Sequence, residues 1–219
     1  MKPPFYFSLL ISSFIISSCS NTALEIEEEK VGKETLIEAA PTWKYRFNPS
    51  STTVKWTAFK HSKKVPVNGK FDSIVVSNFI PSSNVAKSLT GLTFELFTSS
   101  TNTNDKARDW KIITHFFGNL INNSSIKGEI ISANGEQQGN GTVLLDLNGI
   151  KKENAFSWNI DAKDEVFMKA EIDVLNWNGE TALDSLNKVC EAKHTGPDDL
   201  ESILWPNVEI IVLSTLNKE

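Results

Sequence analysis

Two residues near the carboxyl end of the chain have the types and spacing of part of a metal site. Cys190 and His194 are four residues apart, so a helix through them places both side chains on one face. A zinc site, however, takes four ligands, or three and a water. His61 and His115 are the other histidines, and nothing in the sequence fixes their positions. We therefore interpret the pair as a core thiol and a histidine near a helix end, and we predict no metal site.

The patterns that accompany catalysis are also incomplete. Arg108 and Asp109 are adjacent, and a structural ion pair or an acid near a helix start accounts for them. Gly139 and Gly141 lack the third glycine of a dinucleotide site and lead into a strand, which indicates a turn or bulge. Gly-x-Ser-x-Gly, His-Glu-x-x-His and phosphate-loop patterns do not occur. The sequence predicts neither an enzyme nor a cofactor.

A third chemistry, covalent lipidation, is indicated at Cys19. Lys2 precedes an apolar run from Phe5 to Ile16, too short for a bilayer span but typical of a secretory signal. The boundary Ile16-Ser-Ser-Cys19 resembles the lipobox of bacterial lipoproteins, which implies removal of residues 1–18 and lipid on Cys19. An ordinary signal peptide with an incidental cysteine is the alternative. Several acyl chains hold a protein firmly on a membrane.

Location follows from the same segment. We expect a protein of the cell envelope, anchored by lipid, and the outer membrane is favoured in a diderm because Ser20 does not suggest inner-membrane retention. Residues 19–42 are Glu-rich and predict a solvated acidic tether. The formal net charge is −5, or −6 once Lys2 is removed, and no basic block is present. These charges argue against nucleic acid as a partner. They leave any protein partner unknown.

Residues 43–219 predict a mostly β domain. Apolar and polar residues alternate in several segments, the pattern of antiparallel strands with one wet face. The clearest runs are 54–58, 92–96, 143–147, 156–160, 166–174 and 208–212, with a longer stretch at 65–80. Two segments, 105–120 and 181–194, have helical spacing and predict amphipathic helices on the β scaffold, and 98–104 predicts a loop. We expect an all-β fold with small helices, a barrel or a sandwich.

Large aromatic residues recur across these elements. In a small closed barrel, inward residues either fill the interior or line a cavity for one ligand, and the pattern leaves both alternatives open. The candidate cavity residues are Trp56, Phe71, Phe79, Phe94, Phe116, Phe117, Trp158, Phe167 and Trp177.

Several motifs, in order, resemble the YceI-like proteins. They are Tyr45-x-Phe47 with Val54-x-Trp56, the segment Val65-x-Val67-x-Gly69-x-Phe71, Arg108-Asp109 with His115-Phe116-Phe117, Gly139-x-Gly141-x-Val143 with Gly149 and Lys152, and Asp173 with Trp177. The resemblance implies an eight-stranded, lipocalin-like antiparallel barrel with an apolar cavity. It also implies a polyisoprenoid or other long-chain lipid as ligand, an extracytoplasmic location and no catalysis. This chain departs from the pattern by its lipobox and by an insertion at 178–206, expected to cap or narrow the cavity mouth.

Two functions from different classes remain open at this point. The first is a membrane-anchored protein that holds a polyisoprenoid-like amphiphile in the barrel. The second is a non-catalytic structural or interaction lipoprotein of the envelope, whose barrel is filled by its own side chains.

Overall fold

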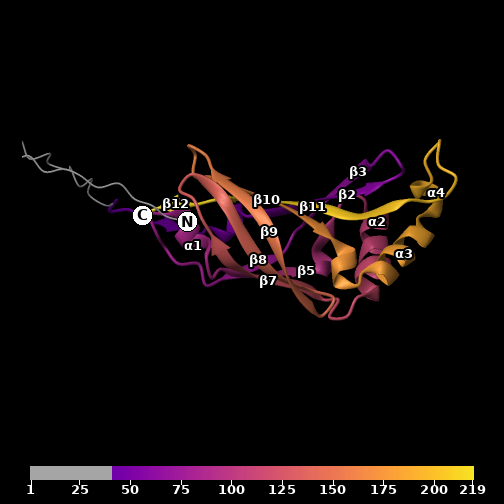
Figure 1. The fold of residues 1–219 in the computed structure, drawn as a ribbon, viewed down its shortest axis with the longest axis horizontal. Coiled ribbons are helices and arrows are strands. Elements are labelled where there is room, and N and C mark those ends of the chain that lie inside the picture. The colour runs from indigo at the N-terminus through magenta and orange to yellow at the C-terminus, as the bar shows by residue number, and fades with distance from the viewer. Residues whose placement is uncertain (1–40) are drawn as a thin grey trace, which may run out of the picture. The chain divides into compact units, whose positions relative to one another are not determined.

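The computed structural model describes residues 41–219 (Figure 1). The expected signal segment, Cys19 and nearly all of the acidic tether lie outside the described residues. The strands are β1 (Tyr45–Arg46), β2 (Thr53–Lys60), β3 (Val65–Phe71), β4 (Ile74–Ser77), β5 (Thr93–Phe97), β6 (Thr101–Asn102), β7 (Ser125–Ala133), β8 (Gln138–Leu147), β9 (Ile150–Ile160), β10 (Glu165–Asp173), β11 (Leu204–Thr215) and β12 (Asn217–Lys218). The helices are α1 (Val85–Leu89), α2 (Lys106–Lys111), α3 (Glu180–Val189) and α4 (Glu191–His194). None of the helices in this part of the chain has the length and apolarity needed to cross a bilayer.

One antiparallel sheet closes on itself. Its strand order is β4-β5-β7-β8-β9-β10-β11-β2-β3-β6. Since β3 runs on into β4 and β5 runs on into β6, these four strands act as two long bent ones. They pair with each other in both parts, Ile74 opposite Leu96 and Phe71 opposite Thr101. The result is a barrel of eight strands in which each strand pairs with the next in sequence and β11 pairs with β2.

The β class and the barrel are therefore confirmed, with three local differences. The predicted loop 98–104 contains a 3-10 turn and β6, which joins the sheet to β3. The sequence analysis did not identify β7 or α1. Where alternation was clear the strands are present: β10, for example, ends at Asp173, one residue before the predicted end.

The two predicted helices are present in modified form. Asp105 caps α2, accepting hydrogen bonds from the N–H groups of Ala107 (3.0 Å) and Arg108 (3.1 Å). A π-helical turn and a 3-10 turn then extend the helical segment to Asn119. The segment predicted as one helix from 181 to 194 is divided into α3 and α4 at Cys190.

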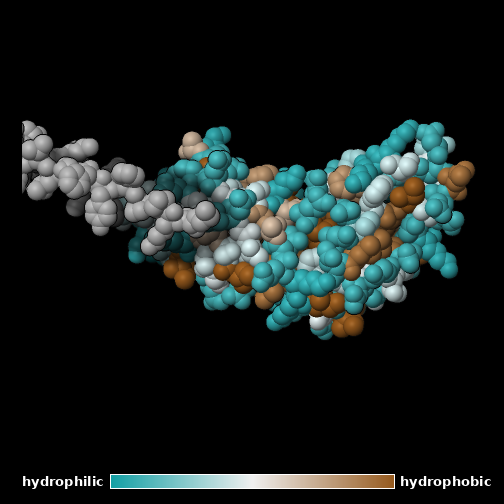
Figure 2. All heavy atoms as spheres, viewed as in Figure 1, coloured by the Kyte–Doolittle hydropathy of each residue, from teal (hydrophilic) through white to brown (hydrophobic). Residues whose placement is uncertain are grey.

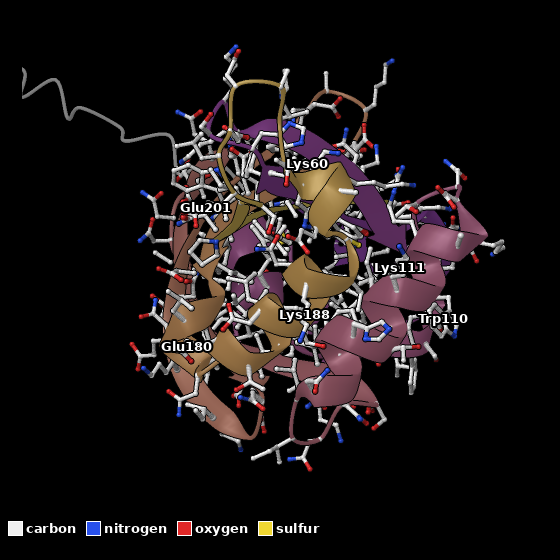
Figure 3. The ribbon with its side chains drawn as sticks, turned by 90° about the vertical axis from the view of Figure 1, so that its right-hand side faces the viewer. Lys60, Trp110, Lys111, Glu180, Lys188 and Glu201 are labelled. Carbon is white, nitrogen blue, oxygen red and sulfur yellow. The ribbon has the colours of Figure 1, made fainter. Side chains whose placement is uncertain are left out.

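Helices α2, α3 and α4 lie together at one end of the barrel, opposite the end that carries α1 (Figure 1). Figure 3 looks at the α3 end and labels Lys60 and Lys111, which hold the helices in place. Lys60 Nζ donates to the carbonyl oxygen of Lys193 (2.8 Å) and Lys111 Nζ to that of Val189 (3.2 Å). The insertion at 178–206 thus covers this end of the barrel.

The buried apolar side chains form two clusters along the barrel. The α1 cluster consists of Tyr45, Val85, Ala86, Leu89, Leu92, Ile130, Phe156, Trp158, Ile160, Val166 and Leu216. The α3 cluster consists of Val54, Trp56, Phe71, Leu96, Phe117, Leu120, Leu145, Leu147, Trp177 and Ala182. The face that carries β9 and β10 is largely hydrophilic outside, and hydrophobic side chains gather on it toward α3 (Figure 2). The strands therefore turn their apolar face inward.

Candidate functional site

A cavity extends along the inside of the barrel and is lined by members of both clusters. The space in which the centre of a water-sized sphere fits is about 170 Å³, compared with about 10–15 Å³ for a single water. Its walls are Phe47, Thr52, Val54, Phe71, Ile74, Val76, Phe79, Leu89, Leu92, Phe94, Leu96, Ile126, Ile130, Val143, Leu145, Leu147, Asn154, Phe156, Val166, Met168, Lys169, Ala170, Ile172, Ile210, Val212, Ser214 and Leu216. The interior is thus hollow and almost entirely apolar.

Each of the four polar lining residues, Thr52, Asn154, Lys169 and Ser214, has a polar partner, and that of Lys169 is the carboxylate of Glu209 (3.7 Å). Thr52 Oγ1 and Ser214 Oγ share a hydrogen bond of 2.8 Å. Asn154 Nδ2 donates to the carbonyl oxygen of Ala155 (3.0 Å). Because these groups already have partners, a ligand in the barrel does not need to supply hydrogen bonds to them. An apolar chain therefore fits the walls.

Glycines opposite aromatic residues explain why the interior is hollow. Trp56 is paired with Gly69, Phe94 with Gly128, and Phe156 with Gly141. A Cβ on any of these glycines would lie 2.2–2.3 Å from the ring of its partner. Each ring therefore lies along the wall, over the neighbouring glycine, instead of crossing the lumen.

The barrel wall is incomplete between β9 and β10. Their pairing runs from Val166 opposite Ile160 to Ala170 opposite Phe156 and stops there, although both strands continue. We call the unpaired region, residues 150–155 of β9 and 171–173 of β10, the β9–β10 window. Asn154 on one border and Ile172 on the other line the cavity, so the window lies against it.

The structure places three of the predicted site residues, Phe71, Phe79 and Phe94, on the cavity wall. The other six lie elsewhere. Trp56, Phe116, Phe117 and Trp177 pack in or against the α3 cluster, Trp158 belongs to the α1 cluster, and Phe167 alternates with lining residues and faces outward. Contact of any of them with a ligand stays a prediction.

Most of the wall is aliphatic, and the sequence analysis did not select these positions. Val143 and Leu145 on β8, and Met168 and Ala170 on β10, come from segments whose alternation was recognised. These aliphatic residues could have been found by asking which alternate positions of each strand face the interior. A search for aromatic residues alone does not identify those positions.

The candidate metal and catalytic residues do not assemble into a reactive site. Within residues 41–219, no group of three or more His, Cys, Asp or Glu side chains is placed to hold a metal ion. His194 Nδ1 hydrogen bonds with Asn187 Oδ1 (2.9 Å), and burial, with nearby positive charge, lowers the pKa of His194 to about 4. Asp109 Oδ1 accepts from the N–H and hydroxyl of Thr103, both at 2.7 Å, and so fixes the start of α2.

The fold has counterparts among solved structures. A polyisoprenoid binding domain from Saccharophagus degradans matches with a TM-score of 0.56 and 12% identity over 81% of this chain and 98% of that one. BcnA of Burkholderia cenocepacia matches with a TM-score of 0.54 and 13% identity over 78% and 99%. No family model and no curated protein matches the sequence. The chain therefore has the fold of these two proteins, as the resemblance to YceI-like, lipocalin-like barrels implied.

Proposed function

We propose that this protein binds a long-chain amphiphile of the polyisoprenoid class inside its barrel. The observation that carries the proposal is the elongated apolar cavity. On β10 its wall runs from Val166 to Ile172, about 20 Å of strand at about 3.3 Å per residue. The name of the Saccharophagus degradans domain supports the choice of ligand class.

The energetics favour a hydrocarbon chain over a compact polar ligand. Burial of apolar surface contributes about 25 cal/mol per Å², so a chain that leaves water for this cavity binds without a polar network. We propose a carrier or sequestering role without catalysis.

We further propose that lipid on Cys19 anchors the protein outside the cytoplasm, with the outer membrane favoured in a diderm. The support is the Ile16-Ser-Ser-Cys19 boundary in the sequence. Cys19→Ala should release the protein from the membrane fraction. Retention of that variant after a high-salt wash would contradict the anchor.

Native mass spectrometry of protein purified without detergent tests the ligand. We expect the mass of one bound lipid, identified after organic extraction. Ala170→Phe places a large ring in the cavity and should lower lipid occupancy severalfold, because Ala170 lines the wall. Asn159→Phe is the control, since Asn159 is exposed on the same side of the wall as Phe167.

A protein that is ligand-free, takes up no polyprenyl alcohol or quinone and has its interior filled by its own aromatics would contradict this function. The structural or interaction lipoprotein would then replace it.

A further inference from the structure

The β9–β10 window has defined borders. At one end the strands separate beyond the pair Ala170 and Phe156. At the other end Asn148, in the turn between β8 and β9, bridges to the chain that follows β10. Its Nδ2 donates to the carbonyl oxygens of Trp177 (2.8 Å) and Asn178 (3.1 Å). The window is therefore a stretch of unpaired backbone between two tied ends.

Lys152 is placed on the inner face of the wall beside this window. It pairs directly with Leu145, which lines the cavity and is 5% exposed, and directly paired residues of a sheet share a face. Lys152 is nevertheless exposed, whereas its inward neighbours Ile150 and Asn154 are half-buried. Its side chain therefore starts on the inner face and is exposed to water, at a level where β9 no longer pairs with β10.

The window also presents backbone donors. The N–H of Asp161 donates to the carbonyl of Glu165 (3.0 Å), so odd-numbered residues of β9 exchange hydrogen bonds with β10. In the window this ladder has ended. The N–H groups of Glu153 and Ala155 therefore point to the opening.

The charges around the window leave Lys152 without an acidic partner. Within the described part of the chain it forms no ion pair. The nearby carboxylates of Glu153, Glu171 and Asp173 belong to outward positions. Glu171 accepts from Asn207 Nδ2 (2.9 Å), and Asp173 accepts from the N–H of Leu175 (3.0 Å).

We propose that the β9–β10 window holds the anionic head of the ligand, phosphate in class, while its chain lies in the cavity. Lys152 supplies the charge and the N–H groups of Glu153 and Ala155 supply hydrogen bonds. This inference rests on the proposed lipid binding and adds that the head leaves through the side of the barrel.

The test compares farnesyl phosphate with farnesol, which share one chain, on the purified full-length protein stripped of lipid. Calorimetry should show the phosphate binding about tenfold more tightly. Lys152→Met should remove this preference and leave farnesol affinity unchanged. Lys151→Met, which removes the same charge from an outward position paired with Asp146, should retain the preference. Excess inorganic phosphate should not displace farnesyl phosphate.

Three results would overturn the inference: no preference in the unaltered protein, equal loss in Lys151→Met, or inorganic phosphate binding as tightly as the lipid. Binding of farnesol without any preference would leave the proposed function standing and remove only the head site. Failure of both lipids to bind would contradict both the proposed lipid binding and the head site.

Discussion

Strand β9 has two different neighbours. Toward β8 it is paired over its full length, from Gln138 opposite Asn159 to Leu147 opposite Ile150. Toward β10 the pairing covers only the half near α1, and the rest borders the window. We call these the closed seam and the open seam.

The residues differ accordingly. At the closed seam Gly139 and Gly141 are paired with Trp158 and Phe156, and the Phe156 ring lies over Gly141. Where β9 borders the open seam, its inward positions are Ile150, Lys152 and Asn154, of which two are polar. The comparison indicates that the closed seam contributes stability and the shape of the cavity, whereas the open seam places polar side chains and unpaired backbone groups beside the cavity.

The largest expected effect is at the closed seam. Gly141→Ala places a Cβ 2.3 Å from the ring of Phe156 and 2.5 Å from the carbonyl oxygen of Ser132, so the backbone itself must move. We expect the free energy of unfolding in urea to fall by about 3 kcal/mol. Gly118→Ala is the control because its nearest neighbour would be at 3.4 Å. Equal effects of the two changes would show that the aromatic–glycine contact is unimportant.

A smaller difference in stability is expected between substitutions at paired and at unpaired residues of the open seam. The N–H groups of Ser157 and Ala155 both face β10, but only Ser157 has a partner there, Lys169. Ser157→Pro should therefore lower the free energy of unfolding by about 2 kcal/mol more than Ala155→Pro, because it removes a ladder hydrogen bond. Similar losses in chemical denaturation would mean that the window is closed in solution.

The smallest expected effect is a loss of stability at acidic pH, which must be separated from the effects at the two seams. His194, near the α3 end, has its pKa lowered to about 4 by burial, below its value in the unfolded chain. As pH falls below about 6.5, the unfolded chain takes up a proton that the folded one does not, so stability is lost toward pH 4. Between pH 7 and about pH 5.5 we expect a loss of about 1 kcal/mol that His194→Gln reduces. An unchanged pH dependence in that variant would assign the loss to other groups.

The parts of the fold that were predicted have strong local patterns. Alternation in 166–174 identified β10, and the spacing of 105–120 identified the helical segment that begins with α2. β7 was missed because Gly128 occupies an inward position in the middle of the strand and interrupts the alternation of apolar and polar residues. α1 was missed because five residues are too few for helical spacing to be recognised.

The candidate site was only partly predictable for the same reason. Aromatic content pointed to nine residues, of which Phe71, Phe79 and Phe94 line the cavity. Whether a ring fills the lumen or lies along the wall depends on the residue opposite it. Gly128 comes 34 positions after Phe94 in the sequence and meets it only across β5 and β7.

The sequence by itself determined the class of fold, the inward and outward phase of the clearest strands and the two main helical segments, because period and capping act between residues close in the chain. Only the tertiary structure decided that the barrel is hollow and that β9 and β10 separate beside Lys152. Both features depend on which residues are opposite each other on neighbouring strands. The alternation within one strand determines the face on which each side chain lies, but it determines neither the partner strand nor the residue at which pairing ends.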